Sequence, residues 1–262
     1  SPVEKRTTGA HLRFWHHKAA LRLSEKRSFH KPFQQEFFMS QAVLLNDLQR
    51  WSRRAGFTLS EETLRPLAAY LELLMQWNRV MNLGGTRTAE ETFTTLVMDS
   101  LHLATFLDGD WTTATHLQDM PDCWDLGSGA GLPGLPLRML WQKGTYWMVE
   151  AREKRALFLS TVLARTPLPR TNVFRGRVEA FMAGPPQRTA DLVVSRAFMP
   201  WPAVLDLVRS SLNPSGVVIL LLREDVRQDP LWPQQTKIWN LLATTSYEAG
   251  SVRRFLCALQ LH

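Results

Sequence analysis

Twelve consecutive residues dictate how this chain folds: Asp125-Leu-Gly127-Ser-Gly129-Ala-Gly131-Leu-Pro-Gly134-Leu-Pro136. They follow a short β-prone run near 123–126 and precede a helical pattern near 133–141, so they predict a strand, a tight turn and a helix. Glycine adopts positive φ without steric cost and lets a ligand approach the backbone. The free N–H groups at the start of the next helix favour an anionic group. We therefore expect a ligand-binding turn at the edge of a sheet.

The residues after this turn alternate between short strands and helices, which predicts an α/β fold with a parallel sheet covered by helices. We expect strands near 123–126, 145–150, 171–175, 191–195 and 217–222, and helices near 133–141, 152–164 and 201–212. The Pro-punctuated stretch 224–235 is predicted to be a loop. Two β-prone stretches, 240–247 and 252–261, predict a terminal antiparallel hairpin on the sheet edge.

Three helices are predicted before the turn. The first ends at Gly56, and Ser60 caps the second. The second helix carries an apolar stripe formed by Leu64, Leu67, Ala68, Leu71, Leu74 and Met75. The capping box Thr88-Ala-Glu-Glu91 opens a third helix, which runs to the turn at 108–110. We therefore expect a helical N-terminal subdomain over 39–119 and an α/β domain over 120–262.

Composition narrows the function classes. The chain has 262 residues, of which 45% are hydrophobic and 21% charged, as in an ordinary globular protein. The longest apolar run, Val217–Leu222, is too short to span a membrane. Two cysteines exclude a disulfide framework or a cysteine-built zinc site, and no histidines have metal-ligand spacing. We expect a cytoplasmic protein that binds no metal and no membrane.

The basicity of the chain is concentrated at its N-terminus. Residues 1–38 hold eight Lys and Arg against three acidic residues, so +5 of the formal net charge of +7 lies there. We predict a flexible basic extension over 1–38 and leave three interpretations open: a non-native leader, an RNA-seeking arm or a targeting peptide. The charge of the whole chain is therefore weak evidence about the folded body.

Two cofactor classes suit the glycine-rich turn. Gly129-x-Gly131-x-x-Gly134 matches the dinucleotide fingerprint. With Asp125 two residues before Gly127, however, the run resembles motif I of class I methyltransferases that use S-adenosylmethionine (SAM). A carboxylate there suits an ammonium and a sulfonium and repels a pyrophosphate. Glu150, at the end of the second strand, is placed to accept hydrogen bonds from ribose hydroxyls. A plain turn without a ligand is the third interpretation.

Several blocks of the chain in order resemble one family, the bacterial small-subunit ribosomal RNA methyltransferase G family, also called glucose-inhibited division protein B. The blocks are Leu74–Leu83 with Trp77-Asn78 and Asn82, Asp99-Ser100-Leu101, Asp125–Pro136, Glu150 with Lys154-Arg155, Arg177-Val178-Glu179, and Asp191–Ala197 with Ser195-Arg196. The resemblance covers about 40–262 and leaves 1–38 unmatched. Departures include Thr95-Leu96, where the family usually has Arg-His, and Arg223-Glu224, where it has Lys-Gly.

The resemblance implies a Rossmann-like class I methyltransferase with a seven-stranded sheet and SAM as its cofactor. It implies methylation of N7 on one loop guanine of 16S rRNA, with the 30S subunit as partner. Together the residues and the resemblance predict a SAM site formed by Asp125, Gly127, Ser128, Gly129, Gly131, Leu132, Glu150, Val178, Glu179 and Arg196.

Arg196 is the predicted catalytic residue because it ends a strand at the ligand-binding edge of the sheet. Its guanidinium suits a SAM carboxylate or an RNA phosphate. Guanine N7 has a lone pair and no proton, so methyl transfer needs positioning rather than a general base. The predicted phosphate contacts are Arg87, Lys154 and Arg155, with Arg175 and Arg177 as further candidates. We expect a monomer.

Three other functions remain open from the sequence. A SAM-dependent methyltransferase with another substrate is the nearest. An NAD(P)-dependent Rossmann oxidoreductase is disfavoured by the carboxylate of Asp125. An RNA-binding module that keeps the cofactor scaffold without turnover is the non-catalytic alternative.

Overall fold

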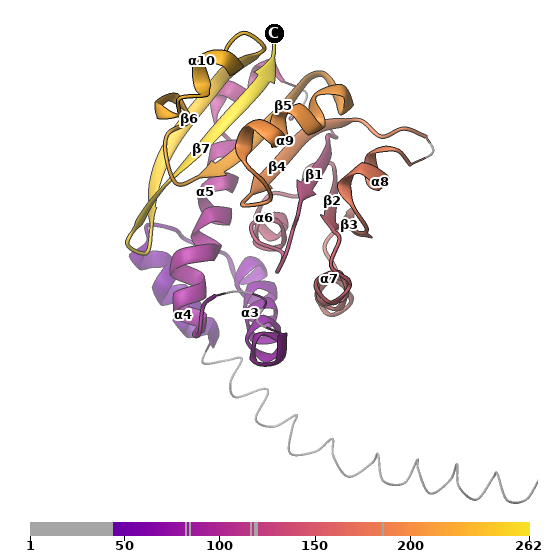
Figure 1. Ribbon diagram of the computed structural model, residues 1–262. Helices are drawn as coiled ribbons and strands as arrows, with labels where there is room; N and C mark the ends of the chain where they lie inside the picture. The colour runs from indigo at the N-terminus through magenta and orange to yellow at the C-terminus, as the bar shows by residue number, and fades with distance from the viewer. Residues whose placement is uncertain (1–43, 82, 84, 116, 118–119, 185) are drawn as a thin grey trace, which may run out of the picture. The chain divides into compact units, whose positions relative to one another are not determined.

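The computed structural model describes residues 44–81, 83, 85–115, 117, 120–184 and 186–262. The predicted extension over 1–38 lies outside these residues. Residues 1–46 and 47–262 form separate units, and the fold below is that of the second. Its centre is one seven-stranded sheet with the strand order β3-β2-β1-β4-β5-β7-β6 (Figure 1). The strands are β1 Asp122–Leu126, β2 Thr145–Glu150, β3 Thr171–Arg175, β4 Ala190–Arg196, β5 Leu212–Leu222, β6 Trp239–Ala249 and β7 Val252–Leu261.

The direction of the strands confirms the predicted topology. The five strands β1 to β5 pair in parallel, whereas β7 runs antiparallel to both β5 and β6. The order reverses at β1, which lies between β2 and β4. Leu126 of β1 is in register with both Val149 and Ser195, so the carboxyl ends of the three central strands are level. In open α/β sheets this reversal point is where ligands bind.

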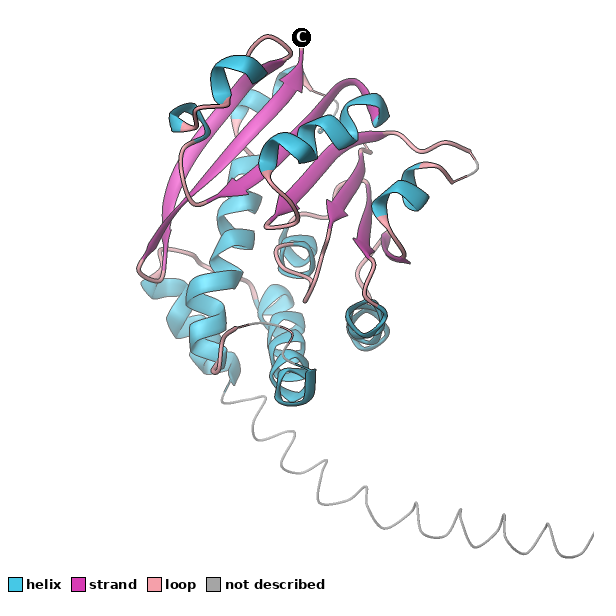
Figure 2. Ribbon diagram, in the orientation of Figure 1, coloured by secondary structure: helices cyan, strands magenta, loops and turns pink. Residues whose placement is uncertain are grey.

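Helices cover the sheet and precede it (Figure 2). Residues 47–54 are helical, and the other helices are α3 Glu61–Met81, α4 Ala89–Thr92, α5 Met98–Leu107, α6 Gly134–Leu140, α7 Glu153–Arg165, α8 Val178–Met182, α9 Trp201–Val208 and α10 Trp232–Gln235. A π-helical turn, Phe93–Val97, joins α4 to α5. Short 3-10 turns lie at Asp110–Ala114, Arg209–Ser211 and Val226–Gln228.

The helix starts follow the predicted capping chemistry. Ser60 Oγ accepts a hydrogen bond from the backbone N–H of Thr63 at 3.3 Å, and α3 begins at the next residue, Glu61. Thr88 Oγ1 accepts from the N–H of Glu91 at 3.1 Å, as in a capping box. The Glu91 carboxylate accepts from the N–H of Arg87 rather than from that of the cap itself.

One local prediction was wrong, one helix is shorter than expected, and one short helix was missed. The stretch 224–235 is not a loop, because it holds a 3-10 turn and α10. Asp225 caps that 3-10 turn by accepting from the N–H of Arg227, and Pro233 suits the first turn of α10. The helix predicted to end near 212 ends at Val208, because Leu212 already begins β5. The short helix α8 was not predicted.

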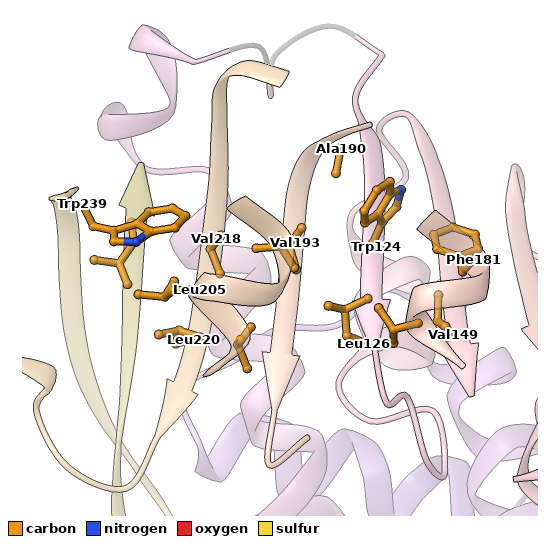
Figure 3. Close-up of a cluster of buried hydrophobic side chains, with 14 residues drawn as sticks. Trp124, Leu126, Val149, Phe181, Ala190, Val193, Leu205, Val218, Leu220 and Trp239 are labelled. Atoms are coloured by element: carbon orange, nitrogen blue, oxygen red, sulfur yellow. The ribbon is translucent and has the colours of Figure 1, made fainter. Parts of the chain in front are cut away.

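The core lies between the sheet and its two helical layers. Figure 3 shows Trp124, Val193 and Val218 of the sheet in one buried cluster with Leu205 of α9 and Phe181 of α8. All five side chains are fully buried. Burying one such aliphatic side chain stabilises a fold by about 1.5–3 kcal/mol. The helices α8 and α9 therefore hold one face of the sheet, while α6 packs with α3 and α5.

Candidate active site

The glycine-rich turn joins β1 to α6 and depends on glycine. Gly127, Gly129 and Gly131 have positive φ values of 70°, 58° and 82°. A Cβ on Gly127 would overlap the ring of Phe198, so no other residue fits there without displacing that ring. The N–H of Gly127 donates to the carbonyl of Val149 at 2.9 Å, which ties the turn to β2. The turn is thus held close to the ends of β2 and β4.

Asp125 lies beneath this turn and not in the wall of either cavity described below. Its side chain is almost completely buried, and one carboxyl oxygen, Oδ2, has no hydrogen-bond partner among the described residues. Burial raises the pKa of Asp125 to about 7, a shift that the positive charge of Arg196 opposes. A Cβ on Gly134 would overlap this oxygen. The residue expected to contact a cofactor therefore supports the turn from below.

The first cavity opens at the carboxyl ends of the strands and has a volume of about 370 Å³. Five predicted site residues line it: Gly127, Glu150, Arg155, Val178 and Glu179. Its wall also includes Phe198 and Met199, which sequence reasoning missed although they directly follow Ser195-Arg196-Ala197. Because it combines apolar side chains with a carboxylate at the switch point of the sheet, this cavity suits a nucleoside.

Glu150 fixes the floor of the first cavity. It is only 5% exposed, and its Oε2 accepts a hydrogen bond from the N–H of Gly129 at 2.9 Å. Oε1 accepts from the N–H of Arg152 at 2.7 Å. A carboxylate oxygen has more than one acceptor position, so both can still accept from a ligand hydroxyl. Glu150 therefore orders the turn and offers acceptors at the same time.

A second cavity of about 230 Å³ lies on the other side of the turn. Its predicted site residues are Gly127, Ser128, Gly129, Leu132, Arg155 and Arg196. The helical layer contributes Leu74, Asn78, Leu83 and Leu96. Gly127, Arg155 and Ala197 line both cavities, so the two meet at the turn. Gly131 lines neither of them.

Arg196 ends β4 and is held by a carboxylate from the helical layer. Its Nε donates to Oδ2 of Asp99 on α5 at 2.5 Å. Asp99 is fully buried, whereas the Arg196 side chain is 19% exposed. The next residue, Ala197, has a φ of +51°, a conformation that a non-glycine residue adopts only under constraint. The chain therefore turns sharply at the predicted catalytic residue.

The predicted phosphate contacts are not brought to one place. Arg155, on α7, lies between the two cavities, and Lys154 before it is exposed. Arg87 lines a third hollow with Arg79, and this hollow shares Asn78, Gly85 and Thr86 with the second cavity. The two further candidates each pair with an acid on the surface, Arg175 with Glu153 and Arg177 with Glu179.

The helical block Trp77-Asn78 is part of the packing around the second cavity. The Trp77 ring lies edge-on to Phe158 of α7, with ring centroids 5.4 Å apart. Asn78 donates to the carbonyl of Thr86 at 2.8 Å. These contacts favour the interpretation of the block as a packed helix end over a base-stacking site.

No cluster of three or more His, Cys, Asp or Glu side chains suitable for a metal ion occurs among the described residues. None of the described helices is both long and apolar enough to cross a membrane. Both cysteines, Cys123 and Cys257, are free and buried.

Comparison with known proteins identifies relatives over most of the chain. Residues 63–246 match the family model described as rRNA small subunit methyltransferase G. A Nitratidesulfovibrio vulgaris protein named Ribosomal RNA small subunit methyltransferase G is 52% identical over 218 residues, covering 83% of this chain and 94% of that protein. A Lawsonia intracellularis protein of the same name is 44% identical over 223 residues, covering 85% and 98%.

A solved structure supports the fold independently. The METTL16 methyltransferase domain aligns with a TM-score of 0.51 at 12% identity, covering 76% of this chain and 81% of that one. At this identity the likeness concerns the fold alone, which is that of a methyltransferase domain.

Proposed function

This chain belongs to the rRNA small subunit methyltransferase G family, and from that membership we propose that it transfers a methyl group from SAM to N7 of one guanine in 16S rRNA. The observation that carries the proposal is the pair of cavities that meet at Gly127, Arg155 and Ala197. A methyl transfer needs a donor site and an acceptor site in contact, because the two reacting atoms must meet. We assign the first cavity to the cofactor and the second to the acceptor base.

The residues of the first cavity fit SAM. Bound SAM supplies an electrophilic methyl group on a sulfonium. Glu150 would accept hydrogen bonds from the ribose hydroxyls, Val178 would pack against the adenine, and Glu179 or the nearby backbone would recognise the edge of the adenine. The glycine turn fits too, because Gly127 lines both cavities and a side chain there would overlap the ring of Phe198 in the wall of the first cavity. Asp125 adds a buried carboxyl group beneath the turn, and its charged form would attract a cationic ligand.

The residues of the second cavity would orient the acceptor guanine. Guanine N7 carries its lone pair in the ring plane and no proton, so no residue has to act as a base. Leu74, Leu83 and Leu96 exclude water from the acceptor, and Arg196 offers a guanidinium to a polar atom of the nucleotide. Leu96 stands where the family usually has a polar residue, and its apolar side chain makes this wall drier. Because the proposed substrate is ribosomal RNA, we expect the enzyme to act in the cytoplasm. We also expect it to bind the 30S subunit as a monomer.

Two of the alternative functions considered from the sequence are less well supported. The NAD(P)-dependent oxidoreductase finds no support among the relatives, which carry the name of a methyltransferase. A binding module without turnover would not require the two cavities to meet. Methyl transfer in a turnover assay would exclude such a module, and SAM binding without transfer would support it.

The first test is calorimetric titration of the purified protein with SAM and with NADH. We expect saturable SAM binding only, and we expect Gly127→Arg to abolish it because a side chain there would overlap the ring of Phe198 in the wall of the first cavity. Gly184→Arg is the matched control, since Gly184 has no positive φ and its nearest neighbour would lie 3.4 Å from the new Cβ. NADH binding without SAM binding would overturn the proposal.

The second test identifies the acceptor. Radiolabelled SAM is supplied with 30S subunits, naked 16S rRNA or transfer RNA, each isolated from cells that lack this modification. We expect label in 16S rRNA, and strand cleavage by borohydride and aniline at one guanine, because N7 methylation makes that nucleotide sensitive to this treatment. Label confined to transfer RNA or to protein would contradict the assignment.

A further inference from the structure

Asp99 is a buried carboxylate around which four elements of the fold meet. It lies on α5 and is 0% exposed. Its Oδ2 accepts from Nε of Arg196 on β4 at 2.5 Å, and its Oδ1 accepts from the hydroxyl of Tyr247 on β6 at 2.7 Å. Nε of Arg254 on β7 lies 3.3 Å from Oδ1, an ion-pair distance without good hydrogen-bond geometry. These donors come from positions far apart in the sequence.

A fully buried carboxylate is costly, so its presence at Asp99 has to be explained. Removing a carboxylate from water costs several kcal/mol, and only well-placed donors offset that cost. A hydrophobic residue in its place, without the charges around it, is often equally stable. One hydrogen bond to each carboxylate oxygen, from Arg196 and from Tyr247, and the nearby charge of Arg254 compensate the buried charge, and the two hydrogen bonds hold the Arg196 and Tyr247 donors in one orientation. Orientation, rather than stability, is what this arrangement provides.

The contact with Arg196 is made through one atom of the guanidinium. Asp99 binds Nε, which leaves the two terminal nitrogens of Arg196 for a ligand in the second cavity, whose wall Arg196 forms. A guanidinium is planar, so fixing Nε fixes the plane in which those nitrogens donate.

The terminal hairpin supports the arrangement from behind. Tyr247 reaches Asp99 from β6, and its ring stacks on His102 of α5, with centroids 4.2 Å apart and an interplanar angle of 22°. Figure 1 shows α5 passing along the hairpin strands β6 and β7, and α5 contacts β6. The hydroxyl of Tyr247 is therefore held at Asp99 by a second, independent contact.

We propose that Asp99, supported by Tyr247, is a positioning residue that orients Arg196 toward the methyl acceptor. This inference rests on the proposed function and adds to it a role for α5 and the C-terminal hairpin in catalysis. Asp99 touches neither cavity, so it acts through Arg196 and not on the substrate.

The test is Asp99→Asn, a substitution that keeps the size of the side chain and removes its charge. We expect kcat for methylation of 30S subunits to fall by about 100-fold, the effect of misplacing a reacting group by roughly 1 Å. SAM affinity by calorimetry should stay within about threefold, because no atom of Asp99 lines the first cavity.

Asp191→Asn is the matched control. Asp191 lies at the opposite end of β4 and also accepts two hydrogen bonds, from the N–H of Asp122 and from Asn213. Its loss destabilises the same strand away from the site, so kcat at 25 °C should match that of the wild type. A fall in kcat for Asp191→Asn as large as for Asp99→Asn would show that general destabilisation explains both, and would overturn the proposal.

A double-mutant cycle separates positioning from structure. If Asp99 acts only through Arg196, then Arg196→Ala and the double variant Asp99→Asn/Arg196→Ala should have equal single-turnover rates. Multiplied losses in the double variant would overturn the proposal. If Asp99→Asn does not fold, Tyr247→Phe takes its place, because it removes one hydroxyl and keeps the ring on His102; we expect a fall in kcat of about tenfold, from the loss of one hydrogen bond to a charged group.

The proposed function and the positioning role fail in different ways. A wild-type protein that binds SAM but labels no rRNA overturns the proposed function. An active wild type with an equally active, folded Asp99→Asn variant overturns the positioning role and leaves the function intact.

Discussion

At the scale of single residues, Asp125 is the acid whose surroundings matter most. It is buried completely, so its charged form lacks water, and the charge of Glu150 adds to the rise in its pKa to about 7. Arg196 lowers the pKa but does not restore the usual value. Near neutral pH the carboxyl is thus balanced between two protonation states, and a cationic ligand beside the turn favours the charged one.

Asp125 should make the stability of the protein fall as pH rises. Because the pKa is raised on folding, the folded state binds more protons than the unfolded state between about pH 4 and pH 7. The free energy of unfolding should therefore decrease across this window, by on the order of 2–4 kcal/mol from this group. In Asp125→Asn that decrease should disappear. The free energy of unfolding of the variant should therefore rise relative to that of the wild type from pH 5 to pH 8.

Urea titrations at each pH measure the difference between the two proteins. Asp225→Asn is the control, because hydrogen bonding to Arg227 lowers the pKa of Asp225, and its difference from the wild type should be flat over the same range. A difference for Asp125→Asn that does not change with pH would contradict the raised pKa.

Glu150 should set the affinity for SAM. Glu150→Gln replaces two acceptor oxygens by one acceptor and one donor, so it loses one of the bonds to the N–H groups of Gly129 and Arg152 and one acceptor for the ribose. We expect the Kd for SAM to rise by about tenfold or more, since hydrogen bonds to charged groups contribute about 1.5–3 kcal/mol. Glu153→Gln, at an exposed glutamate three residues on, should leave the Kd unchanged, and calorimetry compares the two.

At the scale of elements, Arg138 joins α6 to the starts of two strands. It is 0% exposed, and its guanidinium donates to the carbonyls of Trp141, Lys143, Gln142, Gly144 and Pro169 and to the hydroxyl of Thr171. The connection from α6 to β2 thus folds around one side chain. This contact lies at the end of the sheet opposite to the cavities, since β2 and β3 begin there.

Arg138→Met should destabilise the fold without touching the site. The substitution leaves several buried carbonyls without a donor, and we expect a loss of about 3–5 kcal/mol in the free energy of unfolding. Arg170→Met is the matched control: Arg170 also donates to the carbonyls of Gly144 and Gln142, but it is exposed, so the loss should stay below about 1 kcal/mol. Equal losses in thermal unfolding would refute the role of burial.

The helices and strands also show which parts of the fold can be predicted from local sequence. The parallel strands and their helices were predictable because short apolar runs, capping residues such as Ser60 and glycine turns act within a few residues. The helix α8 was missed because its five residues are too few to show a helical period. α10 was missed because Pro233 suits the first turn of a helix as well as a loop.

At the scale of the whole molecule, the site depends on contacts between distant parts of the chain. Gly127, Glu150 and Val178 were predictable as site residues because each follows or ends a strand at the same sheet edge. The carboxylate that holds Arg196 was not predictable, because Asp99 and Arg196 are 97 residues apart and no local pattern links them. The same holds for the second cavity, whose walls come from both α3 and the glycine-rich turn.

The cavity residues and most of the net positive charge lie in different parts of the sequence. All residues that line the two cavities lie between 74 and 199, while residues 1–38 carry +5 of the net charge. A protein of residues 39–262 should therefore bind SAM with a Kd within about twofold of the full chain, because no cavity residue is removed. Calorimetry on both proteins measures this, and a lost SAM site would contradict the assignment of the cavities.

The same two proteins decide what the basic extension does for RNA. Each phosphate that a cation neutralises adds about 0.7 to the slope of log Kd against log salt for single-stranded RNA. Eight cations lie in residues 1–38, so an arm that binds RNA would give the full chain a clearly steeper slope than residues 39–262. Equal slopes would show that the folded body alone, with Arg155 at its cavities, makes the phosphate contacts. The extension would then make no contact with the RNA phosphates.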